Sequence, residues 1–174
     1  MVSFDAGDIG AIVEQLAREI GLPDHLPIAV DVDESVPLGR ARIRSIEPVV
    51  LDVQGGALED SKRLRAFSPQ AATRALGRLL FQVRDLLDPA FGDPPPDDEL
   101  SLQLRVAWDV NAAGRLERLG HPAQRQRWLY AFRTRHGFSD EVDRAFEHLW
   151  ESGNLVWGDI ERCSAEARSS VVGA

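Results

Sequence analysis

Residues 118–138 contain the side chains best suited to chemistry, because five arginines and two histidines lie there without any acidic residue. Guanidinium groups bind carboxylates and phosphates through paired hydrogen bonds, so this composition indicates recognition of an anion. The whole chain nevertheless has a formal net charge of −8. Because clustered like charges repel one another, we expect an acidic protein surface or a small anion beside this stretch.

The spacing within this stretch predicts a helix that starts near Pro122. On its helical wheel Trp128 and Phe132 share an apolar side that Arg125 interrupts. Arg127, Tyr130 and Arg133 face outwards. Such a surface suits an acidic partner, and stacking on Trp128 or Tyr130 would also suit phosphate or RNA. The alternative is a core helix whose outer arginines are simply solvated.

A second basic pair, Arg74 and Arg78, lies one turn apart on the helix predicted to begin at Pro69. Like charges at this spacing destabilise an isolated helix by roughly a few tenths of a kcal/mol, so a carboxylate should compensate them. Asp109 is the candidate from elsewhere in the chain. The predicted partner-binding face consists of Arg74, Arg78, Arg125, Trp128 and Arg133.

Residues 28–88 read as a short hairpin, an apolar strand that ends in a glycine-rich loop, and a helix with the sequence RALGRLL at residues 74–80. This layout resembles small zincin-type metallopeptidases, whose helix carries two histidines that bind zinc and a glutamate that acts as general base. The corresponding positions here hold Arg74, Ala75 and Arg78, which can neither bind zinc nor move a proton. The resemblance therefore implies a scaffold that has lost its metal and its hydrolytic activity.

Three charged residues, Arg105, Asp109 and Arg115, lie on a predicted helix whose apolar residues are distributed almost all the way round. Such a helix is central, and buried charges are tolerated there only when they are paired. We therefore predict a structural ion pair between Asp109 and an arginine of this helix or a neighbouring one, in preference to an active-site acid.

The one close set of carboxylates on predicted strands is Asp31, Asp33 and Asp52. Carboxylates of this kind can hold a divalent metal, but arginines are predicted opposite two of them, so we expect no metal site. The chain has neither a P-loop nor a dinucleotide-binding pattern, and its four histidines never have the spacing of metal ligands.

Scattered residues leave two other classes of function open. A hydrolase could assemble its site from Asp109, His121 and His136, because catalytic groups can come from distant positions. A weak RNA binder could use the basic and aromatic stretch, although the acidic balance of the chain argues against nucleic acid in general.

The elements that must position these side chains begin with a helix of about fourteen residues, in which Ile9, Val13, Leu16 and Ile20 recur at helical spacing. Residues 28–33 and 40–45 alternate as strands do. We predict that these strands pair antiparallel, with Asp33 opposite Arg40 and Asp31 opposite Arg42. Residues 49–53 are mostly apolar and predict a third strand, either central or covered on both faces.

Four further helices are predicted by periodicity and capping residues. They begin at Pro69, at a cap on Asp97 or Asp98, near Pro122, and after the cap Ser139. Residues 155–157 are predicted to pack back as a short turn or strand. A stiff proline-rich stretch at residues 92–96 separates a mixed first part from a helical second part.

We therefore expect one domain over residues 1–174, with an α+β part at about 1–91, a helical part at about 97–162 and a flexible tail at 169–174. The expected class is α+β, dominated by five or six helices, with a small antiparallel sheet of about three strands. The single cysteine, Cys163, fits a reducing compartment. Neither an ordinary secretory signal at the N-terminus nor an apolar segment of membrane-spanning length is found in the sequence. We predict a non-enzymatic cytoplasmic binding or regulatory protein without cofactor or metal.

Overall fold

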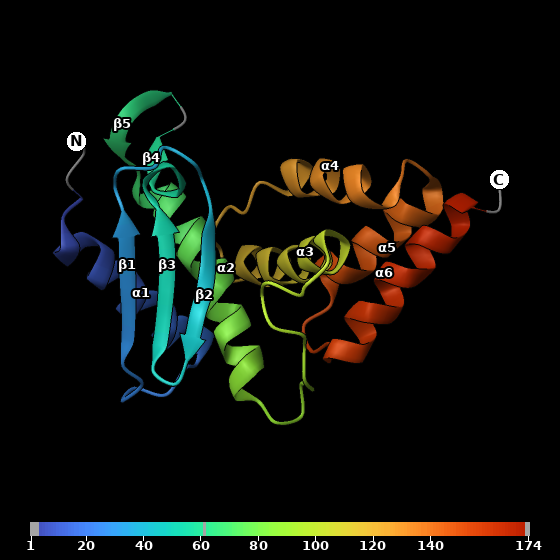
Figure 1. Cartoon of the computed structure of the whole chain (residues 1–174), viewed down its shortest axis with the longest axis horizontal. Helices are drawn as coiled ribbons and strands as arrows, with labels where there is room; N and C mark the ends of the chain where they lie inside the picture. Colours follow the sequence, from blue (N-terminus) through green and yellow to red (C-terminus); the bar gives the residue numbers. More distant parts are fainter. Residues whose placement is uncertain (1–3, 61, 173–174) are drawn as a thin grey trace. The chain divides into compact units, whose positions relative to one another are not determined.

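The computed structural model describes residues 4–60 and 62–172, without the side chains of residues 64, 65 and 169–172. The chain divides into two compact units, residues 1–87 and 88–174. The predicted boundary near residue 91 lies close to this division, while the single-domain organisation stays a prediction. The helix-dominated α+β class is confirmed, and Figure 1 labels the elements.

The first unit begins with α1 and ends with α2, and its strands lie between them in the sequence. Its elements are α1 (Ala6–Ile20), β1 (Ile28–Asp33), β2 (Ala41–Ile46), β3 (Val49–Gln54), the 3₁₀ helix η1 (Gly55–Ala57), β4 (Glu59–Asp60), β5 (Arg63–Phe67) and α2 (Pro69–Leu87). The predicted apolar pattern of α1 is confirmed, since all four of its residues are buried: Ile9, Val13, Leu16 and Ile20. Asp5 caps the helix by accepting a hydrogen bond from the Gly7 amide.

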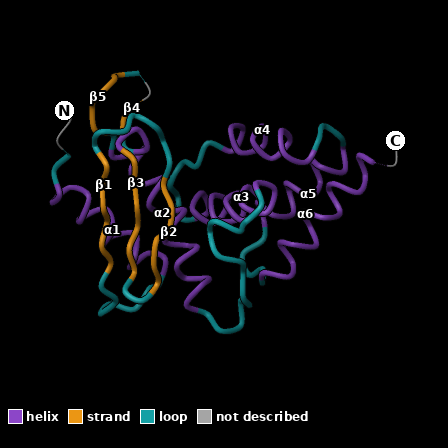
Figure 2. Tube along the Cα trace, in the orientation of Figure 1, coloured by secondary structure: helices purple, strands orange, loops and turns teal. Residues whose placement is uncertain are grey.

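Strand β3 is the centre of a three-stranded sheet in the order β1-β3-β2 (Figure 2). Its residues Val49, Leu51 and Val53 are at most 1% exposed, which confirms the prediction of a central strand. In the first unit α2 packs against β2, and α1 packs against α2. A short antiparallel ribbon, β4–β5, was not predicted.

The predicted hairpin between residues 28–33 and 40–45 is wrong, because β3 lies between these strands. β1 runs parallel to β3, and β2 runs antiparallel to it, so the three-stranded sheet is mixed. Arg42 therefore lies opposite Asp52, with 3.1 Å between guanidinium and carboxylate, and Arg44 reaches both Asp52 (2.9 Å) and Asp31 (2.5 Å). Charge complementarity alone could not fix the pairing, because Asp31 and Asp52 are neighbours on the same face of the sheet.

The second unit consists of four helices: α3 (Leu102–Arg118), α4 (Arg125–His136), α5 (Asp140–Glu151) and α6 (Trp157–Val172). Within this unit α3 contacts each of the others. The closest approach is at Gly114, where an added Cβ would lie 2.2 Å from the Trp150 carbonyl oxygen. The predicted cap of α5 is confirmed, because the Ser139 hydroxyl accepts a hydrogen bond from the Val142 amide.

Two predicted boundaries in this unit are wrong. α3 begins after Ser101, whose hydroxyl accepts a hydrogen bond from the Leu104 amide, whereas Asp97 bonds instead to Arg105. Trp157 begins the long helix α6 rather than ending a turn or strand. This helix includes residues 169–172 of the predicted tail, and residues 173–174 lie outside the described part of the chain. None of the helices that the structure describes combines the length and apolar character of a membrane span.

Candidate functional site

The arginines of α4 find their acidic counterpart on α5 of the same chain. Arg133 donates two hydrogen bonds to Asp143, at 2.8 and 2.6 Å. This bidentate contact raises the pKa of Arg133 and lowers the pKa of Asp143. Arg125 pairs with Glu147, and its guanidinium carbon lies 5.4 Å from the centre of the Phe146 ring. The acid expected beside residues 118–138 is therefore at least partly intramolecular.

Arg118, at the start of the same basic stretch, binds the C-terminal end of α5. It donates hydrogen bonds to the carbonyl oxygens of Trp150 and Ser152, the latter at 2.9 Å. The buried Asn111 side chain donates to the carbonyls of Leu149 (2.8 Å) and Ser152 (2.9 Å). A cation at this position favourably opposes the helix dipole, so Arg118 stabilises the α3–α5 contact.

The outward side of α4 agrees with the helical wheel at Arg127 and Tyr130 but not at Arg133. Trp128 and Arg133 are half-buried, whereas Arg127 is exposed. Tyr130 and Phe138 are 67% and 69% exposed, and their ring centres lie 6.4 Å apart. The exposed aromatic and basic surface therefore includes residues that the predicted set did not name.

The remaining predicted residues are placed as follows. Arg74 and Arg78 are half-buried on α2 of the first unit, and Arg78 donates a long hydrogen bond (3.5 Å) to the Ala41 carbonyl of β2. In the second unit Arg105 pairs with Asp97, and Arg115 is buried. The ion pair of Asp109 with an arginine, and its role beside the α2 arginines, stay predictions.

His136, named for a possible hydrolase site, is buried between helices. It is 4% exposed, and its Nε2 lies 2.8 Å from the hydroxyl of Ser164, which is 2% exposed. Its ring stacks on Phe132 at 4.0 Å. Burial lowers the pKa of His136, with a smaller contribution from the charge of Arg168. The described structure therefore uses His136 as a neutral, buried contact between α4 and α6.

Metal and thiol chemistry have little support in this geometry. Within the described residues, no group of three or more histidine, cysteine, aspartate or glutamate side chains is placed to hold a metal ion. The Cys163 thiol is buried, and this burial raises its pKa to about 11. A thiol with such a pKa is protonated at neutral pH and is a poor nucleophile.

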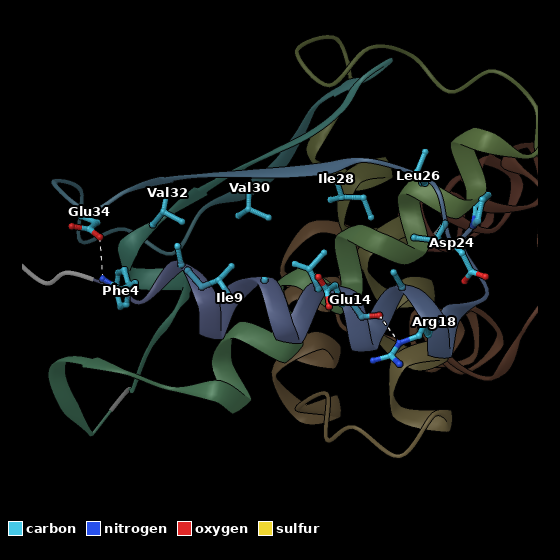
Figure 3. Close-up of a pocket in the computed structure, with 16 residues that line it drawn as sticks. Phe4, Ile9, Glu14, Arg18, Asp24, Leu26, Ile28, Val30, Val32 and Glu34 are labelled. Carbon is cyan, nitrogen blue, oxygen red and sulfur yellow. Dashed lines mark hydrogen bonds between the residues drawn. The ribbon is translucent and has the colours of Figure 1, made fainter.

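A groove with a volume of about 910 Å³ lies between α1 and β1 in the first unit (Figure 3). In Figure 3 Ile28, Val30 and Val32 point from β1 towards α1. These side chains are half-buried, although their partners on β3 are almost fully buried. The helix layer therefore covers β3 but leaves the apolar side of β1 partly open to solvent.

The opposite wall of the groove is formed by α1, where small residues leave room. Ala6, Gly10 and Ala17 line it together with Ile9 and Val13. A Cβ added at Gly10 would meet no other atom within 4 Å, so the space at this position is empty. The groove exists because α1 packs on α2 and because its side towards β1 carries short side chains.

Charged residues at the rim of the groove are mainly acidic. Glu14, Asp24 and Glu34 oppose the single guanidinium of Arg18, which gives three negative charges against one positive charge, or −2. Glu34 also accepts a hydrogen bond from the Phe4 amide at 3.0 Å, which ties the entry of α1 to the end of β1. The groove is thus an apolar channel with an acidic rim.

The sequence reasoning missed this groove. The alternation of β1 predicted one buried face, but it could not show that the edge of this face stays uncovered. Gly10 inside a helical pattern was the available signal, because a glycine there often has a packing or functional reason.

Comparisons with known proteins yield no relative: no family model, curated protein or solved structure matches this chain. The resemblance to the zincin scaffold accordingly stays a prediction.

Proposed function

We propose that this protein is a non-catalytic cytoplasmic binding module that holds a peptide segment of a partner protein in the groove between α1 and β1. The observation that carries the proposal is the half-buried apolar side of β1, which faces a groove of about 910 Å³. Ligand sites in proteins are concave and mostly apolar, with a few polar groups at their margins, and this groove has that character.

The shape of the groove favours a peptide over a compact small molecule. Its lining follows β1 over residues 28–32 and continues at both ends of the strand to Leu26 and Glu34. Six residues of strand, the length of β1, extend over roughly 20 Å. An elongated apolar channel beside a strand is the geometry in which extended peptides are recognised.

The test is selection from a displayed library of random heptapeptides on three forms of the protein. We expect sequences that bind the wild type and the Gly10→Ala variant but not the Gly10→Phe variant, because a phenyl ring at this position fills the empty space in the groove. The alanine variant is the matched control for changing a helical glycine. Enrichment of no sequence, or of sequences that bind Gly10→Phe equally well, would refute the proposal.

A second candidate is recognition of an acidic partner by the outer surface of α4. It is favoured by the exposed Tyr130–Phe138 pair, with Arg127 and Arg135 also exposed on α4. Aromatic residues and arginine are enriched at protein interfaces. Arg125 and Arg133 contribute less to this proposal than the sequence predicted, because α5 already supplies carboxylates to both.

A charge-reversal comparison tests this second candidate. Arg127→Glu together with Arg135→Glu should abolish binding of a synthetic polyglutamate peptide, measured by fluorescence anisotropy at low salt. Replacing Arg144, an exposed arginine of α5, with glutamate serves as the control and should leave binding unchanged. Equal binding by both variants would exclude the α4 surface.

A further inference from the structure

Resting on the proposed function, we infer that the occupant of the groove is an extended segment that adds to the free edge of β1 as a further strand and alternates apolar with basic residues. Its apolar side chains lie in the groove, and its basic side chains lie on the outer face of the sheet. The partner is therefore defined by its backbone conformation and its charge pattern.

Strand β1 lies at one edge of the three-stranded sheet. Among the strands that the structure describes, only β3 pairs with β1, so the other edge of β1 is available for hydrogen bonding. Edge strands present a row of backbone amides and carbonyls that can pair with another chain. The groove lies along the apolar side of this same edge, so one extended segment can satisfy both the edge and the groove.

The two-residue period of β1 determines which side chains of the bound segment lie in the groove and which lie on the opposite face of the sheet. Ile28, Val30 and Val32 face the groove, while Asp31 and Asp33 are exposed on the opposite face. A neighbouring strand must follow the same alternation, because side chains of paired strands share faces. Alternate residues of the segment should therefore be apolar, and those between them should be polar or charged.

The sign of that charge follows from the acids at this edge. Asp33 is held by Ser35, whose amide and hydroxyl donate to its carboxylate at 3.0 and 2.5 Å and lower its pKa, so it is ionised at neutral pH. The sheet already contains such a pairing of opposite charges, since Arg42 of β2 lies opposite Asp52 of β3. Opposite charges across neighbouring strands are favourable, so arginine or lysine fits beside β1.

The same charges disfavour a second copy of this chain as the occupant. Antiparallel pairing of β1 with β1 of another molecule would place Asp31 and Asp33 near their own counterparts. Like charges opposite one another in a sheet are destabilising, and inward or edge charges are a common protection against self-association.

The chain itself contains a segment with the required pattern. Residues 40–46, with the sequence RARIRSI, alternate arginine with small or apolar residues, and residues 41–46 form β2 beside β3. A free heptapeptide with this sequence is therefore a suitable probe. Two control peptides test the two parts of the inference: one has its three arginines replaced by glutamate, and the other carries alternate backbone N-methyl groups that block strand pairing.

The experiment is a titration of the ¹⁵N-labelled protein with each peptide, followed by amide chemical shifts. We expect the arginine peptide to shift amides of β1 and of α1 around Gly10, with an affinity at least about tenfold higher than that of the glutamate peptide. The N-methylated peptide should not bind, and Gly10→Phe should abolish the shifts.

Results that differ from these expectations would contradict either the charge pattern, the strand addition or the whole inference. Equal or tighter binding of the glutamate peptide would refute the charge pattern, and undiminished binding of the N-methylated peptide would refute strand addition. Both results would leave the proposed function intact, because the library selection decides that separately. Absence of shifts in β1 with the arginine peptide would refute the inference as a whole. Concentration-dependent shifts of β1 without peptide would identify a second copy as the occupant.

Discussion

At the scale of single residues, Asn111 is the polar side chain whose role the structure defines most completely. It is 2% exposed and binds two carbonyl oxygens at the C-terminal end of α5. Asn111→Ala should lower the free energy of unfolding by about 2 kcal/mol, because both carbonyls lose this buried donor and only the Ser152 carbonyl keeps its hydrogen bond from Arg118. Urea denaturation measures the change. Gln126→Ala removes an exposed amide from α4 and should change stability by less than about 0.5 kcal/mol; equal effects of the two variants would contradict the assigned role.

His136 predicts a dependence of stability on pH. Burial lowers its pKa below the usual value of 6.5, so the unfolded chain binds a proton at this position more readily than the folded chain. The free energy of unfolding therefore has its full value, as far as His136 is concerned, above pH 6.5. It decreases as the pH falls below that value towards the pKa of His136 in the folded state. Urea denaturation at pH 7.5 and 5.5 should show a larger loss for the wild type than for His136→Gln. An identical loss in the variant would assign the effect to other groups.

At the scale of elements, replacing a helical glycine with alanine should change the stability of the protein in opposite directions at two positions. At Gly114 an added Cβ would lie 2.2 Å from the Trp150 carbonyl, whereas at Gly10 it would meet nothing within 4 Å. Gly114→Ala should therefore destabilise the protein by about 1–3 kcal/mol through overpacking. Gly10→Ala should stabilise it by about 0.5–1 kcal/mol, because alanine is the better helix former. Thermal denaturation of both variants tests this contrast, and a change of the same sign at both sites would contradict the packing described.

Local patterns in the sequence were sufficient to predict α1, β1, β3 and α2, because each has an apolar period that matches its burial. They were insufficient for strand pairing, since Arg42 could meet a carboxylate on β1, which precedes β2 in the sequence, or on β3, which follows it. The start of α6 was missed because Trp157 was interpreted as part of an apolar turn. Short-range periodicity can predict individual helices and strands, whereas the contacts between them depend on the whole fold.

At the scale of the whole molecule, the charge distribution indicated by the sequence is partly resolved within the chain. Three of the five arginines in residues 118–138 contact α5 or the residue that follows it: Arg118 binds carbonyls, and Arg125 and Arg133 bind carboxylates. The sequence thus predicted the need for a negative partner but not its location. The groove was not predicted, because it arises where α1 packs on α2 beside an edge strand, and Gly10 alone does not indicate this arrangement.

An extended peptide that pairs with the free edge of β1 would change the hydrogen bonding of the backbone amides in this strand. Hydrogen exchange of the backbone amides, measured with and without a groove-binding peptide from the heptapeptide selection, tests it most directly. We expect slower exchange within residues 28–33, because outward amides of β1 gain hydrogen-bond partners. Unchanged exchange in β1 at saturating peptide, or protection confined to α4, would contradict it.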